Sequence, residues 1–288
     1  MRRTLWTRGP AALAGSALLL ALAACSDSTT PSSTTGIPSA EVSDIGAAAS
    51  DEIDQTVSAL TTPTESPAAS PTAPSCATVN DLTDTDGDGA PDAATYTFAL
   101  PACSFTGFRG GTLEITGSVT LSDPTPSAAD FAFLLTLTDF QFKFTSPDGT
   151  RSYTALRNGT RTLTGNATGL SLSNQITVVR SVPNRADATV THNLLLTFTP
   201  AVGENLAVGQ PLPNGTFAKS GTFTWSRGSI SRTFVVTTVT PLVWDASCTT
   251  DRKITAGETH WTLGDGSYIK VVWTGCGVDP TVSFVPVS

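Results

Sequence analysis

The most chemically suggestive residues form one short run, Asp-Thr-Asp-Gly-Asp-Gly-Ala-Pro-Asp, at positions 84–92. Carboxylates stand at its first, third, fifth and ninth positions, and Gly89 at the sixth would permit a sharp turn. Calcium takes about six to eight oxygen ligands, and alternate carboxylates on a tight loop can direct several of them to one point. Carboxylates this close in sequence also repel one another unless a cation lies between them. The run therefore predicts a calcium site, with a solvated acidic turn as the alternative.

The run resembles the calcium loops of thrombospondin type 3 repeats and, over its first half, the loop of an EF-hand. Thr95 takes the twelfth position, where an EF-hand has a bidentate Glu. We therefore expect water or a carboxylate from elsewhere in the chain to complete the site, around a structural ion. The resemblance implies that the ligands are the carboxylates of Asp84, Asp86, Asp88 and Asp92 and the carbonyl of Ala90.

Few other residues are suited to catalysis. The chain has two histidines, His192 and His260, and it has no Gly-x-Ser-x-Gly, His-Glu-x-x-His or phosphate-loop motif. The glutamates Glu114, Glu204 and Glu258 are scattered, although the carboxylate pair of a glycoside hydrolase need not be close in sequence. His192 lies in an alternating apolar segment and is expected to be a packed residue or an edge residue. We predict that the protein is not an enzyme.

The N-terminus has the pattern of an export signal. Three arginines precede an apolar run from Ala11 to Ala24, which is shorter than the roughly 20 residues of a membrane-spanning helix. The run ends Leu22-Ala23-Ala24-Cys25, which resembles the lipobox of bacterial lipoproteins. The alternative is an ordinary signal peptide cut after an Ala-x-Ala-like site, with a free cysteine nearby.

The lipoprotein resemblance implies that residues 1–24 are removed and that Cys25 carries acyl chains such as palmitate. Several acyl chains together give stable membrane anchoring. Ser26, rather than Asp, follows the cysteine, and in this class that favours the outer membrane over the inner one. We expect a lipid-anchored protein of the cell envelope.

Charge and cysteine content agree with export. Without residues 1–24 the chain has 13 basic and 24 acidic side chains, a balance that disfavours nucleic acid as a partner. The four remaining cysteines could form two disulfides in any of three connectivities. The first two cysteines and the last two are separated by nearly equal numbers of residues, which favours pairing between sequence neighbours. A metal site is disfavoured because no Cys-x-x-Cys is present. The favoured pairs are Cys76–Cys103 and Cys248–Cys276.

Residues 25–75 are predicted to form a lipidated stalk rich in Ser, Thr and Pro. Within it, residues 39–60 have apolar side chains at spacings of three and four, which is typical of one face of an amphipathic helix. Such a helix could be marginal in a flexible arm, or could dock on the following domain.

Residues 76–288 are predicted to form a single all-β domain with an antiparallel, meander-type sheet. Apolar and polar residues alternate over many segments, and Asn214-Gly215 and Asp265-Gly266 are candidate hairpin turns. The alternation shifts by one residue near Asp139, which predicts a β-bulge or a passage between sheet layers. The pattern leaves open a sandwich or a curved half-barrel.

The sequence therefore predicts a membrane-anchored, non-enzymatic β domain with a structural or recognition role and an envelope protein as partner. The alternative is a carrier of lipid or another apolar ligand in a curved sheet. The Phe131–Phe144 group and four tryptophans could line such a groove, although aromatic residues in alternating strands more often fill a core.

Overall fold

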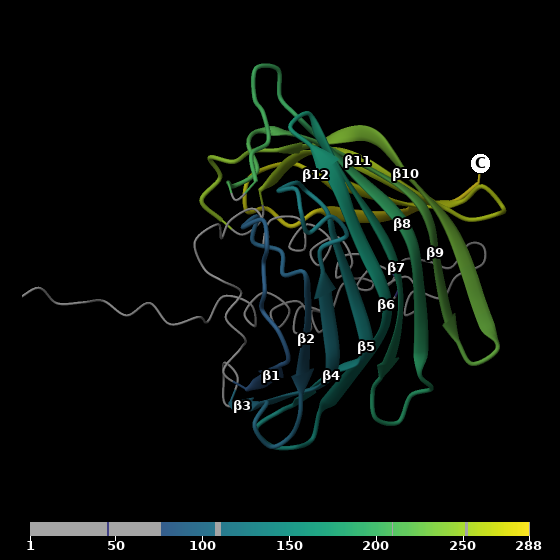
Figure 1. Cartoon of the computed structure of the whole chain (residues 1–288). Helices are drawn as coiled ribbons and strands as arrows, with labels where there is room; N and C mark the ends of the chain where they lie inside the picture. The colour runs from purple at the N-terminus through teal and green to yellow at the C-terminus, as the bar shows by residue number, and fades with distance from the viewer. Residues whose placement is uncertain (1–44, 46–75, 107–110, 209, 251–252, 288) are drawn as a thin grey trace, which may run out of the picture. The chain divides into compact units, whose positions relative to one another are not determined.

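The domain is one antiparallel β-sheet whose strands follow one another in sequence order (Figure 1). The structure is a computed structural model that describes residues 45, 76–106, 111–208, 210–250 and 253–287. The predicted signal peptide, the lipidation site Cys25 and the predicted helix at 39–60, apart from Ile45, lie outside these residues. Ile45 is helical and fully buried.

The sheet has thirteen strands in the order β1-β2-β4-β5-β6-β7-β8-β9-β10-β11-β12-β13, and the short β3 pairs with β4 beside this path. The strands are β1 (Ala77–Val79), β2 (Ala93–Phe98), β3 (Ser104–Thr106), β4 (Thr112–Ser122), β5 (Phe133–Thr145), β6 (Ser152–Asn166), β7 (Gly169–Ser181), β8 (Ala188–Pro200), β9 (Gly215–Arg227), β10 (Ile230–Trp244), β11 (Ile254–Thr262), β12 (Tyr268–Trp273) and β13 (Thr281–Val285).

The predicted all-β meander is confirmed. Of the two architectures left open, the structure has a single curved sheet and not two packed sheets (Figure 1). Asp265-Gly266 forms a tight hairpin turn between β11 and β12, closed by the Gly266 N–H bonding to the Leu263 carbonyl at 3.0 Å. Asn214-Gly215 instead closes the long β8–β9 loop. Within the described residues, no helix is long and apolar enough to cross a membrane.

One face of the sheet carries the core. Along β8 every second residue from Ala188 to Phe198 is buried, and the residues between them face solvent to a greater extent. Cross-strand pairing continues this face, so that Val190 on β8 lies beside Trp225 on β9. The tryptophans in the strands are all buried, as a core role predicts: Trp225, Trp244, Trp261 and Trp273.

A β-bulge keeps this face in phase along β5. Pairing with β6 shifts between Leu137 and Phe140, and Asp139 has a positive φ of 47°. On the other side of β5, a Cβ atom at Gly117 would lie 2.1 Å from the Asp139 carbonyl oxygen, so only glycine fits beside the bulge. The predicted phase shift is therefore a bulge within one sheet.

The two disulfides have the predicted connectivity. Cys76 bonds to Cys103, and Cys248 bonds to Cys276. The first links the start of β1 to the segment before β3, and the second links the loop before β11 to the loop after β12. Both therefore join loops at the ends of the short strands near the edges of the sheet.

Of the two predicted alternatives for His192, the structure shows a packed core residue. Its side chain is 4% exposed, and its ring contacts the edge of Phe223 with 5.3 Å between centroids. Burial lowers the pKa of His192 to about 3, and the positive charges of Arg180, Arg161 and Arg157 act in the same direction. The imidazole is therefore neutral at physiological pH.

Acid should destabilise the domain through His192. Its pKa is about 3 in the folded protein, against 6.5 ordinarily. The neutral imidazole therefore makes its full contribution to the free energy of unfolding above pH 6.5. That contribution is lost as pH falls toward 3, by up to about 1.4 kcal/mol per pH unit. We expect His192→Phe to flatten the slope of unfolding free energy against pH between about 6.5 and 4.5, measured by urea denaturation. Equal slopes in the two proteins would contradict this assignment.

Removal of the Cys76–Cys103 disulfide should lower the unfolding free energy by about 2–5 kcal/mol, because the bridge closes a loop in the unfolded chain. The double variant Cys76→Ser, Cys103→Ser tests this by urea denaturation. The control for the substitutions themselves is the comparison of variant and wild type in reductant, where neither protein has either disulfide. A variant as stable as the oxidised protein would show that the bridge contributes nothing.

Candidate metal centre

The acidic run forms the loop that joins β1 to β2. Backbone hydrogen bonds close the loop at its base, with the Asp92 N–H donating to the Thr83 carbonyl at 2.7 Å. The Cys76–Cys103 disulfide spans the same segment of chain. The backbone of the acidic loop is therefore held by strands at both ends, and a disulfide links the segments that flank it.

Asp84 organises the turn. One carboxylate oxygen accepts the Gly87 N–H at 2.8 Å, and the other accepts the Gly89 N–H at 3.0 Å. Both glycines have positive φ, 78° and 95°, a conformation that other residues adopt at a cost. Gly89 thus provides the sharp turn that its position in the run predicts.

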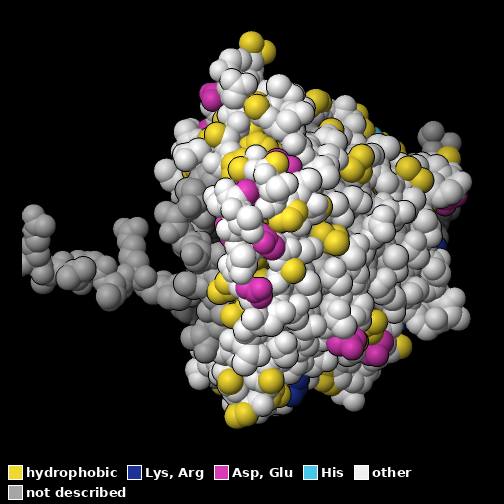
Figure 2. Space-filling view, viewed as in Figure 1, with side chains coloured by type: hydrophobic (Ala, Val, Ile, Leu, Met, Phe, Trp, Pro, Cys, Tyr) yellow, Lys and Arg dark blue, Asp and Glu magenta, His cyan; other side chains and the backbone are white. Residues whose placement is uncertain are grey.

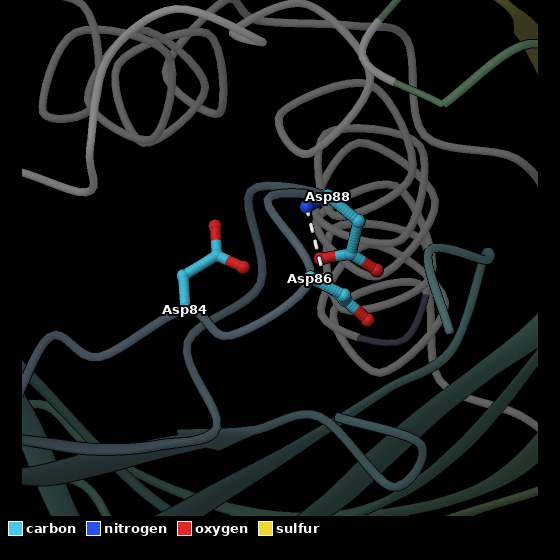
Figure 3. Close-up of side chains that lie close together, drawn as sticks. All are labelled: Asp84, Asp86 and Asp88. Atoms are coloured by element: carbon cyan, nitrogen blue, oxygen red, sulfur yellow. Dashed lines mark hydrogen bonds between the residues drawn. The ribbon is translucent and has the colours of Figure 1, made fainter. Parts of the chain in front are cut away.

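Asp84, Asp86 and Asp88 converge. One oxygen from each carboxylate lies within 4.8 Å of one oxygen from each of the others, as Figure 3 shows. The Asp88 N–H donates to Asp86 Oδ1 at 3.1 Å, and the Ala90 N–H donates to Asp88 Oδ1 at 2.8 Å. Three hard oxygen ligands in this arrangement suit a calcium ion.

Burial and neighbouring charges disfavour the ionised form of Asp88. Asp88 is 8% exposed, and burial raises the pKa of its carboxyl above the ordinary value, partly offset by the hydrogen bond from Ala90. The negative charges of Asp86 and Asp123 raise the pKa of Asp88 further. A bound cation would relieve both the desolvation and the repulsion.

Asp92 is not among the converging carboxylates. Its two oxygens accept hydrogen bonds from the Thr85 N–H at 3.0 Å and from the Thr85 hydroxyl at 2.6 Å. Asp92 therefore braces the loop, and the structure brings together three of the four carboxylates that the sequence predicts as ligands. Ala90 lies in the same turn, where its N–H bonds to Asp88.

Sequence reasoning did not identify Asp123. This residue follows β4 directly, is 5% exposed, and donates its N–H to the Pro91 carbonyl at 3.0 Å. Thr95 at the twelfth position of the run predicts that a ligand comes from elsewhere in the chain, but it does not indicate which residue. Only the pairing of β2 with β4 brings Asp123 to the acidic loop.

Of the three glutamates considered for catalysis, Glu204 is exposed in the loop between β8 and β9, and the other two are engaged in ion pairs. Glu114 binds Lys143 at 2.8 Å, and Glu258 binds both His260 at 2.6 Å and Lys270 at 2.8 Å. The bond from Lys270 is the leading cause that lowers the pKa of Glu258, followed by the bond from His260. Both glutamates thus serve cross-strand pairing, a structural role.

A hollow of about 440 Å³ lies at the ends of β8, β9 and β10, with Trp244 in its wall. Its lining is mixed, with Pro200, Ala201 and Val243 beside the polar residues Thr199, Asn214, Thr216, Asp245 and Thr255.

The chain matches no known protein family, and neither the curated proteins nor the solved structures contain a significant match to it.

Proposed function

We propose that the protein is an exported, lipid-anchored envelope protein whose β domain has a non-enzymatic structural or recognition role and is stabilised by calcium. The observation that carries the calcium assignment is the convergence of Asp84, Asp86 and Asp88 on a loop that a disulfide spans. Calcium bound there would hold the first strands of the sheet together.

The two disulfides support export. Disulfides persist in oxidising compartments and are rare in the cytosol, and four cysteines outside the predicted lipobox are all paired. This observation is independent of the N-terminal pattern that suggests lipidation of Cys25. Both point to the cell envelope, and the residue after Cys25 favours the outer membrane.

A structural or recognition role is supported by the chemistry of the solvent-facing side of the sheet. Threonines pair there across neighbouring strands, such as Thr224 with Thr233 at 3.0 Å and Thr177 with Thr191 at 3.4 Å. Figure 2 shows a face that is mostly uncharged, with several acidic side chains on its left part and a few others at its lower and right margins. Such a face fits a neutral partner better than nucleic acid.

The alternative function, transport of lipid or another apolar ligand, is less well supported. The aromatic residues that could line a groove are largely buried, and the hollow near Trp244 has a mixed lining that includes Asp245 and three threonines. The curved sheet alone does not indicate a ligand.

Lipid anchoring predicts that Cys25→Ala yields protein that stays in the aqueous phase on detergent phase partitioning, whereas the wild-type protein enters the detergent phase. Ser26→Ala is the matched control and should partition like wild type. Partitioning of Cys25→Ala into detergent would refute the anchor.

Calcium binding predicts a thermal stability that depends on the metal. Calcium at about a hundred times its Kd should stabilise the wild-type fold by about 2.7 kcal/mol. The double variant Asp86→Asn, Asp88→Asn should lose this gain in calcium, with a much smaller change in chelator, because each amide oxygen can still accept the loop N–H that the carboxylate accepts. Thermal denaturation measures both changes.

Asp148→Asn is the matched control, because Asp148 lies on another exposed turn and its carboxylate also accepts a backbone N–H, from Thr150 at 3.1 Å. This variant should retain the calcium response. Equal destabilisation of the double variant in calcium and in chelator would reduce residues 84–92 to an ordinary acidic turn.

A further inference from the structure

Strands β6–β10 carry all of their lysine and arginine side chains on the buried face of the sheet. These five strands contain no aspartate or glutamate. Their six lysine and arginine residues are Arg157, Arg161, Arg180, Lys219, Arg227 and Arg232. In an antiparallel sheet with one solvated face, polar and charged side chains normally lie on that face. The distribution in these strands is the reverse of the usual one and needs a physical cause.

Strand pairing shows on which face each residue lies, because residues directly opposite each other in an antiparallel pair point to the same face. Arg161 is opposite Asn174, which is 1% exposed. Each of the other five is also opposite a buried residue, in the pairs Arg157–Val178, Arg180–Ala188, Lys219–Leu196, Arg227–Ala188 and Arg232–Trp225. All six cations therefore lie among the core residues.

These positive charges are partly or largely withdrawn from water. Lys219 is 3% exposed, and burial lowers its pKa to about 7. Burial also lowers the pKa of Arg161 to about 10, and the charge of Arg157 acts in the same direction. Lys219 Nζ lies 5.2 Å from the centre of the Trp261 ring, but an aromatic face compensates a buried cation only in part. A fold that buries several cations on one face needs anions beside them.

The described strands do not supply those anions. Their acidic residues are Glu114, Asp139 and Glu258. The two glutamates bind Lys143 and Lys270, which are not among the six cations, and Asp139 accepts a hydrogen bond from Asn158 at the bulge. Arg161 and Lys219 lie at least four residues inside their strands, about 13 Å or more from the strand ends where loop carboxylates lie. The anions that face these two cations therefore come from another part of the chain or from a ligand.

The chain before the sheet has the complementary charge. Residues 26–75 contain no lysine, arginine or histidine. Residues 39–60, whose apolar side chains follow the pattern of an amphipathic helix, contain five acidic residues: Glu41, Asp44, Asp51, Glu52 and Asp54. Ile45 belongs to that apolar pattern, is helical and is fully buried. Because the side chains of an isolated helix stay in contact with water, the burial of Ile45 indicates that it packs against other residues.

The connection is long enough to bring this segment to the six cations. Residues 61–75 link it to Cys76 and span up to about 50 Å when extended. In the sheet, β8 is six strands from β1, which is about 29 Å at about 4.8 Å per strand. The covalent link also gives the segment a millimolar effective concentration, which a soluble anionic ligand would have to match.

We propose that the buried face of β6–β10 is the docking surface for residues 39–60 of the same chain. The apolar side of the segment covers the aromatic core residues, and its carboxylates neutralise the six cations. The docked segment is then part of the folded domain, and the tether after the predicted lipidation site is reduced to residues 26–38. The docking stands independently of the calcium site and of the lipid anchor.

Carboxylate labelling of the mature chain tests the docking without any substitution. Carbodiimide and glycine ethyl ester convert accessible carboxylates, and mass spectrometry measures the rate at each residue. We expect Asp51, Glu52 and Asp54 to react at least several-fold more slowly in the native protein than in urea. Glu65 and the exposed Asp187 are the controls and should react at similar rates in both conditions. Native rates for the three residues that equal their rates in urea would overturn the proposal.

Removal of the negative charges should destabilise the sheet. The triple variant Asp51→Asn, Glu52→Gln, Asp54→Asn should unfold at a lower urea concentration than the wild-type protein, because the buried cations lose anions that compensate them. Glu65→Gln is the matched control and should unfold at the wild-type concentration. A triple variant with an unchanged unfolding midpoint would contradict the role of these carboxylates.

Substitution of the cations tests the other side of the contact. In the double variant Arg157→Gln, Arg161→Gln, labelling of Asp51, Glu52 and Asp54 should accelerate toward the rate in urea, while tryptophan fluorescence remains that of the folded sheet. Lys143→Gln is the control, because Lys143 lies opposite Thr154 on the other face, and it should leave the labelling unchanged. If the arginine variant does not fold, the wild-type labelling and the acidic variant still decide the question.

Native mass spectrometry separates this occupant from an anionic ligand. We expect the wild-type protein to have the mass of its mature chain and to retain slow labelling of residues 51–54. A co-purifying anionic amphiphile in equal amount, together with fast labelling of residues 51–54, would overturn the proposal and assign the docking surface to that ligand.

Discussion

Side chains of a β-strand point alternately to the two faces of its sheet, and this structure depends on keeping that alternation in phase across thirteen strands. A shift of one residue in any long strand would exchange its core residues for its solvent-facing residues. The bulge at Asp139 prevents this in β5, where the apolar positions change from odd to even. Gly117 on β4 leaves the space that the bulge occupies.

Much of the fold could be predicted because its determinants are local. Alternation identifies the strands, the phase shift near Asp139 identifies the bulge, and similar cysteine spacings favour the observed disulfides. The hairpin turn predicted at Asn214-Gly215 was wrong. This dipeptide is typical of tight turns, but here it ends the long loop between β8 and β9. The choice between one sheet and two could not be made, because both have the same alternating strands.

In the candidate site, too, the residues that could be predicted are those whose positions depend on nearby sequence. Asp84, Asp86 and Asp88 could be found because their convergence is produced by hydrogen bonds within a few residues, above all from Gly87 and Gly89 to Asp84. Asp92 has the right spacing for a ligand, but a closer donor, Thr85, occupies both its oxygens. Asp123 could not be found, since it reaches the loop only through the pairing of β2 with β4.

The short edge strand β1 has a mechanical consequence. Residues 25–75 join the sheet at β1, which pairs with β2 over only three residues. A pulling force applied through those residues would meet the weakest element of the sheet first, and a strand peeled from an edge breaks its hydrogen bonds one pair at a time. The Cys76–Cys103 bond diverts that force past β1 to the link between β2 and β3, and β2 pairs with β4 over six residues. Load therefore reaches the sheet through a covalent bond and a better-paired strand, while β1 is spared.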